Sequence, residues 1–193
     1  MLKNDKWITE QAKLGMIEPF EDSLVRQLEN RHVISYGLSS YGYDLRLSPS
    51  DFRVFKHIPG TVVNPKRFNA DNLENIPLQT DDDGSFFIIP ANSYALGVSL
   101  ERLQIPSNIT VICIGKSTMA RCGIIANITP AEASWKGYLT LEFSNASSAD
   151  CRIYASEGVL QLLFLEGEPC QTTYAERFGK YQDQPQCVTL AKV

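Results

Sequence analysis

Short apolar runs separated by polar breaks dominate the chain from residue 33 onward. The runs are rich in β-branched and aromatic residues, and Gly, Pro, Asn and Asp stand between them, which is typical of strands joined by turns. We expect strands at 33–36, 43–47, 52–55, 61–63, 85–89, 93–98, 110–114, 123–128, 138–143, 151–154 and 161–166. No long helical pattern separates these runs. The sequence therefore predicts an all-β fold with short helices, an antiparallel sandwich or barrel, rather than parallel βαβ units.

The N-terminal thirty residues lack this strand pattern. A capping residue at position 4 or 5, apolar residues at helical spacing and a stop at Gly15 predict a short helix over 4–15. Residues 16–20 are predicted to form a turn, and a weakly helical or irregular segment is expected to follow up to about Asn30.

Residues 69–84 are polar and acidic and are predicted to form a loop. The segment ends in three aspartates, Asp81 to Asp83, before Gly84. Such a cluster invites a metal hypothesis, but contiguous aspartates before a glycine are typical of a solvated turn. We assign this cluster no role.

Strand 138–143 has a clear period of two. One face carries Leu139, Leu141 and Phe143, and the other carries Tyr138, Thr140, Glu142 and Ser144. Glu142 thus lies on the polar face, where a solvated carboxylate and a functional one both fit the pattern. By the same argument Asp44 and Arg46 share one face of strand 43–47, as an ion pair or as site residues.

The segment Gly-Lys-Ser-Thr-Met-Ala-Arg at 115–121 has the composition of an anion cradle. Its glycine lets the backbone approach a ligand, Lys116 and Arg121 supply charge, and two hydroxyls supply donors. A P-loop would need its first glycine at Thr110, so this type of phosphate loop is excluded.

Length, charge and composition narrow the class of protein. The 193 residues, 44% of them hydrophobic, suffice for a single domain over 1–193 and leave little room for a second. The net charge of −4 comes from interspersed charges, which argues against nucleic-acid and membrane partners. No apolar run approaches a membrane span and the N-terminus lacks a signal-peptide core, so we expect a cytoplasmic protein.

Five sequence blocks together resemble the dCTP deaminase family, relatives of the trimeric dUTPases. They are Ser-Ser-Tyr-Gly-Tyr-Asp-Leu-Arg at 39–46, the cradle at 115–121, Ile-Thr-Pro-Ala-Glu-Ala-Ser-Trp at 128–135, Leu-Glu-Phe-Ser-Asn at 141–145 and Gly-Lys-Tyr-Gln at 179–182. The resemblance implies a dUTPase-like β-clip, a distorted antiparallel barrel, assembled as a homotrimer. It also implies hydrolytic deamination of dCTP to dUTP and ammonia, which supplies dUTP for dUMP and dTTP synthesis.

Zinc chemistry does not fit the sequence. Zinc deaminases carry H-x-E and P-C-x-x-C motifs, whereas this chain has two isolated histidines, His32 and His57, and five cysteines without a C-x-x-C pair. We therefore expect no zinc and no protein-bound metal, with Mg²⁺ carried by the substrate triphosphate.

The resemblance assigns the catalytic roles to three residues. Glu142 would take the proton of the attacking water and pass it to the pyrimidine and the leaving amine. Ser117 would hold that water, and Arg121 would orient and stabilise the site.

Further substrate contacts follow from the same resemblance. The implied set is Lys116, Ser117, Thr118, Met119, Ala120, Arg121, Glu132, Thr140, Leu141, Gln161, Tyr174, Lys180 and Gln184. Glu132 stands where relatives carry an aspartate that reads the deoxyribose 3′-hydroxyl, and the backbone of Thr140 and Leu141 would read the base edge. Residues of about 171–193 would form a flexible lid that orders over the triphosphate.

Three other functions remain open from the sequence. A dUTPase would need a carboxylate to activate water near the phosphates, for which Glu132 is the candidate. A bifunctional enzyme would convert dCTP to dUMP, and a non-catalytic nucleotide-binding regulator would have no need of a base at Glu142. The resemblance also makes dTTP a candidate feedback inhibitor.

Overall fold

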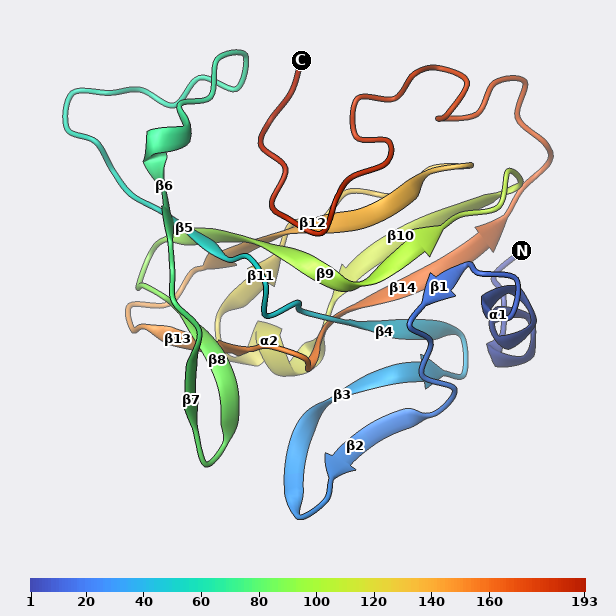
Figure 1. Ribbon diagram of the computed structural model, residues 1–193, viewed down its shortest axis with the longest axis horizontal. Helices are drawn as coiled ribbons and strands as arrows, with labels where there is room; N and C mark the ends of the chain where they lie inside the picture. Colours follow the sequence, from blue (N-terminus) through green and yellow to red (C-terminus); the bar gives the residue numbers. More distant parts are fainter.

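Short antiparallel strands make up the body of the computed structural model, which describes residues 1–193 (Figure 1). The strands are β1 (Ile17–Glu18), β2 (Leu24–Leu28), β3 (Arg31–Ser39), β4 (Gly42–Arg46), β5 (Arg53–Phe55), β6 (Leu73–Asn75), β7 (Gln79–Asp81), β8 (Gly84–Ile89), β9 (Tyr94–Gln104), β10 (Ile109–Gly115), β11 (Ile124–Ala126), β12 (Lys136–Asn145), β13 (Cys151–Tyr154) and β14 (Gly158–Glu166). The helices are α1 (Asp5–Ala12), α2 (Ser117–Arg121) and the 3-10 turn η1 (Ala70–Asn72). The predicted all-β class is confirmed.

The strands form three sheets. The first has the order β11-β12-β9-β5-β6, with β1 also paired to β9, the second β10-β14-β4-β3-β2, and the third β13-β8-β7. Every strand pair in them is antiparallel. Antiparallel pairs need no crossover helices, which agrees with the absence of a long helical pattern in the sequence.

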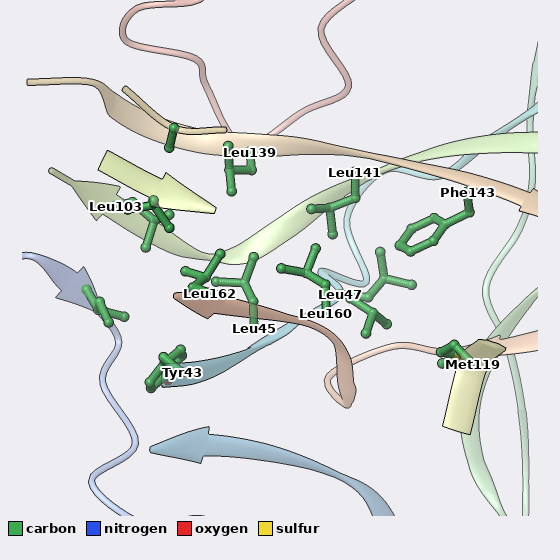
Figure 2. Close-up of a cluster of buried hydrophobic side chains, with 14 of the residues drawn as sticks. Tyr43, Leu45, Leu47, Leu103, Met119, Leu139, Leu141, Phe143, Leu160 and Leu162 are labelled. Carbon is green, nitrogen blue, oxygen red and sulfur yellow. The ribbon is translucent and has the colours of Figure 1, made fainter. Parts of the chain in front are cut away.

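The core lies between β12 and β14. Leu139, Leu141 and Phe143 are at most 7% exposed. Figure 2 shows these side chains pointing from β12 into the cluster that contains Leu160 and Leu162 of β14. The predicted inward face of β12 is confirmed, and its polar face is consequently turned to the other side of the sheet.

Helix α1 has the predicted cap. The Asn4 side chain accepts a hydrogen bond from the Trp7 backbone N–H at 3.1 Å, and Ile8 is fully buried on the core side. The helix ends at Ala12, and Gly15 adopts a positive φ of 90° in the turn that follows. No helix of the protein reaches the length and apolar character that a membrane crossing requires.

Four local predictions were wrong. Segment 21–30 contains β2, which pairs with β3 although its side chains are mostly exposed and show no alternation. Segment 61–63 is not a strand, because Val62 is 91% exposed and no neighbouring strand supplies backbone partners. Segment 69–84 holds η1, β6 and β7 and only ends in the expected turn, and segment 16–20, expected to be a turn, contains the short strand β1.

Candidate active site

A cavity of about 470 Å³ lies over the polar face of β12. Thr140 and Glu142 line it from the strand, and Leu96 and Tyr94 line it from the neighbouring β9. The C-terminal tail, residues 171–193, contributes Tyr174, Lys180, Tyr181, Gln184, Thr189 and Ala191. Figure 1 shows this tail on the side of β12 away from α2. Residues of the connector 128–135 and Phe68 complete the lining, so the cavity is built from two adjacent strands, two irregular segments and the tail.

Of the two cavity carboxylates, Glu142 is half-buried and Glu132 is exposed. The Oε2 atom of Glu142 is inaccessible to solvent and has no hydrogen-bond partner. Burial raises the pKa of Glu142 to about 7, because a desolvated carboxylate is less stable when charged. Beneath it, burial and the nearby charge of Glu142 raise the pKa of the Cys113 thiol to about 12. A carboxylate of this kind can accept and return a proton near neutral pH.

Thr140 is held by the tail from two directions. Its hydroxyl donates to the Gln184 side-chain oxygen at 3.0 Å and accepts from the Thr189 backbone N–H at 3.1 Å. Both Thr140 and Gln184 are less than a tenth exposed. The hydroxyl thus fastens the tail to the strand that carries Glu142.

Gly137 lets the tail approach β12 this closely. The tail forms a parallel bridge between Gly137 and Gln184, and the Tyr138 N–H donates to the Gln184 carbonyl at 3.0 Å. A Cβ at Gly137 would lie 2.6 Å from the Gln184 nitrogen, and its φ of 131° is one that other residues rarely adopt. Any larger residue at this position would displace the tail.

The matched block at 179–182 is also anchored. The Trp135 indole N–H donates to the Tyr181 carbonyl at 2.8 Å, and the Tyr181 N–H donates to the Tyr174 hydroxyl at 2.9 Å. Lys180 lines the cavity while its ammonium donates to the Lys192 carbonyl at 2.7 Å. The lid is thus packed against the sheet, and its mobility stays a prediction.

The cradle at 115–121 lies outside this cavity. Lys116 occupies the N-cap position of α2 without a capping side-chain hydrogen bond, and its ammonium binds the Asp44 carboxylate and donates to the Ser35 hydroxyl at 3.2 Å. Asp44 is 4% exposed, and its second oxygen, Oδ1, is buried without a partner. Of the two alternatives left open for Asp44 and Arg46, an ion pair between them does not form, because Arg46 binds the buried Glu101 at 2.6 Å instead.

The other predicted residues near α2 also lie outside the cavity. Ser117 and Arg121 are exposed, and the Arg121 guanidinium donates to the Ser117 carbonyl at 3.2 Å. None of residues 116–121 lines the cavity. Gln161 of β14 donates to the Ser39 hydroxyl at 3.2 Å, on the face next to Asp44. A single chain therefore does not place Ser117 and Arg121 beside Glu142.

The predicted site residues consequently form two groups. The cavity group comprises Glu132, Thr140, Glu142, Tyr174, Lys180 and Gln184. The α2 group comprises Lys116, Ser117, Thr118, Met119, Ala120, Arg121 and Gln161. Leu141 belongs to neither group and is fully buried in the core, and Met119 of the α2 group is only 4% exposed, so both side chains serve packing.

Several cavity residues were missed from the sequence. The period of two in strand 93–98 would have placed Tyr94 and Leu96 on one face, opposite Ser144 and Glu142. Phe68 reaches the cavity from an irregular loop and had no periodic signal at all. No group of three or more His, Cys, Asp or Glu side chains comes together in a way that would hold a metal ion.

Sequence comparisons relate the chain to a known protein family. A family model described as dCTP deaminase-like matches residues 2–167. The chain belongs to this family. The matched region contains α2, β12 and Glu142, while the tail residues that close the cavity follow it.

Curated members of the dCTP deaminase family resemble the chain over its whole length. A dCTP deaminase of Polaromonas sp. is 51% identical over 99% of this chain and 98% of its own length. One of Nitrosomonas eutropha is 50% identical over 100% of this chain and 99% of its own. These matches extend through the tail.

A solved structure shares the fold. The 2′-deoxycytidine 5′-triphosphate deaminase of Agrobacterium tumefaciens superposes with a TM-score of 0.57 at 15% identity. The superposition covers 93% of this chain, which spans about half, 52%, of the solved chain.

Proposed function

We propose that this chain deaminates dCTP by hydrolysis, releasing dUTP and ammonia. The observation that carries the proposal is Glu142, a half-buried carboxylate whose Oε2 atom is buried without a hydrogen-bond partner and whose pKa is about 7, in a cavity of nucleotide size. Family membership and full-length relatives named dCTP deaminase support the same substrate.

The reaction needs only one group that exchanges protons. The ionised Glu142 takes a proton from water as the water oxygen bonds to C4 of the cytosine, and it passes this proton to ring N3. It then takes the proton of the new C4 hydroxyl and gives it to the amine, which leaves as ammonia when the C4–N bond breaks. The uracil keeps its oxygen at C4 and its proton at N3, so atoms and charge balance.

Magnesium fits the substrate better than the protein. The residues offer no cluster of three carboxylates, histidines or cysteines, so any Mg²⁺ would enter on the triphosphate oxygens. When bound, the ion neutralises phosphate charge. The chain's own contribution at that end would be the ammonium of Lys180 and the tail that carries it.

The complete site is proposed to form between copies of the chain in a homotrimer. The α2 group supplies two cations and the cavity group supplies the base, yet one chain holds them on opposite sides of β12 (Figure 1). A triphosphate carries roughly four negative charges, which the single lysine of the cavity cannot balance. Arg121 and Ser117 of a second copy would complete the site.

An apolar surface beside α2 is available for such an assembly. Ile112 and Ile114 project from β10 and are 40% and 39% exposed, and Ile125 of β11 is 50% exposed. Leu163, opposite Ile112 in the register, adds to the same outer face. Burying aliphatic surface of this kind stabilises subunit contacts.

A product assay tests the activity. Ammonia and phosphate release are measured with dCTP, dCMP, CTP and dUTP in parallel. The proposal predicts dUTP and ammonia from dCTP, with kcat reduced at least ~10²-fold in Glu142→Gln while dCTP still binds. Formation of dUMP and pyrophosphate would establish the bifunctional alternative, and binding without turnover would establish a regulator.

A further inference from the structure

Loop 56–69 is a long excursion between β5 and η1 with no helix or strand of its own. Twelve of its fourteen side chains are exposed, including Val62 at 91%. Only Ile58 and Phe68 are partly buried, and Phe68 is the one that lines the cavity. Irregular connections of this length in small domains usually serve binding rather than packing.

The loop leaves the sheet beside the reacting end of the cavity. Phe55, the last residue of β5 before the loop, stacks on Tyr94 with ring centroids 4.8 Å apart. Tyr94 and Leu96 line the cavity, and Leu96 lies directly opposite Glu142 in the β9–β12 register. Phe68 thus joins the wall formed by these two β9 side chains. In Figure 1 the loop and the C-terminal tail rise on the same side of the sheet.

We propose that Phe68 is a substrate-contacting residue, an aromatic wall against the pyrimidine that keeps bulk water from Glu142. The proposal rests on the proposed function and extends it to a residue outside the five sequence blocks that resemble the dCTP deaminase family. A flat apolar ring complements a flat base, and the acid–base group needs one water rather than open solvent. The solvent-inaccessible Oε2 atom of Glu142 agrees with such a cover.

The charge of the loop agrees with this role. It carries Lys56, Lys66 and Arg67 and no carboxylate, in a chain whose net charge is −4. Lys66 and Arg67 immediately precede Phe68 and form no ion pair. A nucleotide triphosphate would meet attractive charge where the aromatic ring enters the cavity.

The test compares Phe68→Ala with Val62→Ala, an apolar truncation in the same loop that touches nothing in the cavity. Phe68→Ala is expected to raise KM for dCTP about tenfold, the usual scale of a lost aromatic contact. It is also expected to shift the pH dependence of kcat/KM to lower pH, because water reaching Glu142 stabilises its charged form. Phe68→Tyr should restore both values, and Val62→Ala should change neither.

Unchanged KM and pH dependence in Phe68→Ala, with wild-type turnover intact, would overturn the inference and leave the proposed function standing. An equal effect of Val62→Ala would also overturn it, since the loop would then act only as a scaffold. If the wild type does not deaminate dCTP, the proposed function fails separately. The role of Phe68 is then decided by the Kd for dCTP, which only the Phe68 variant should raise.

Discussion

The separation of the two residue groups within one chain makes a quantitative prediction for mixed assemblies. Glu142→Gln removes the base from the cavity group, and Arg121→Ala removes a cation from the α2 group. Each variant alone should turn over dCTP at least ~10²-fold more slowly than the wild type. If every site takes Glu142 from one copy and Arg121 from the next, a mixed trimer contains some sites with both residues intact.

The expected recovery follows from random assembly in a closed ring. In an equal mixture, the copy that supplies the base keeps Glu142 in about half of the sites, and its neighbour keeps Arg121 in about half of those, so about a quarter of the sites are complete. Co-expressed or co-refolded variants should therefore show about a quarter of the wild-type kcat per chain, with KM close to that of the wild type.

The assay measures ammonia release at saturating dCTP, with sedimentation to verify equal assembly. A mixture of Arg121→Ala with Ser117→Ala serves as the control, because both residues lie on α2 and each site receives both from one copy. That control should recover nothing. An inactive Glu142→Gln and Arg121→Ala mixture that still forms trimers would refute the shared site, as would an active wild-type monomer.

Other predictions concern pH, the tail, an ion pair and metals. Since burial raises the pKa of Glu142 to about 7 and the base must be ionised, kcat/KM should fall as the pH drops below about 7, and a flat profile from pH 5 to 8 would contradict this. The raised pKa also means that ionisation costs folding free energy, so urea unfolding should show Glu142→Gln gaining stability over the wild type as the pH rises from 4.5 to 7. Gly137→Ala should displace Gln184 and raise KM for dCTP about tenfold in initial-rate kinetics, because the added Cβ would lie 2.6 Å from the Gln184 nitrogen. Lys116→Ala should lower the free energy of unfolding by about 3 kcal/mol by leaving Asp44 buried and unpaired, and adding Asp44→Asn should recover most of that loss. Activity should survive zinc chelators but depend on Mg²⁺, and loss with zinc removal followed by rescue with zinc would contradict the metal-free mechanism.

The sequence predicted those parts of the fold that depend on local pattern. The period of two in β12 placed Glu142 on the face opposite the core residues, and the Asn4 cap located the start of α1. Each of these signals is contained within a few consecutive residues of its own segment. The sequence-based prediction failed where a neighbouring strand decides whether a segment becomes a strand. Val62 and Val63 have strand-forming side chains but no strand beside them, whereas β2 forms without alternation because β3 supplies its hydrogen bonds.

The site was predicted only as a set of residues, and its arrangement required coordinates. No local pattern reveals that Lys116 binds Asp44 rather than facing Glu142, because Lys116 and Asp44 are far apart in the sequence. Phe68 was missed for the related reason that an irregular loop has no period to interpret. The resemblance carried the list of residues, and the fold then divided that list between the cavity and the region of α2.

The tail that lines the cavity is synthesised after every strand of the fold. All the strands precede Gly167, so the core can form while Tyr174 to Ala191 are still being synthesised or have not yet left the ribosome. The nascent protein can then be folded before it has a nucleotide cavity. The position of the tail also affects tagging. An affinity tag fused after Val193 would lie close to Ala191 at the edge of the cavity, whereas a tag fused before Met1 would lie next to Glu166, at the end of β14.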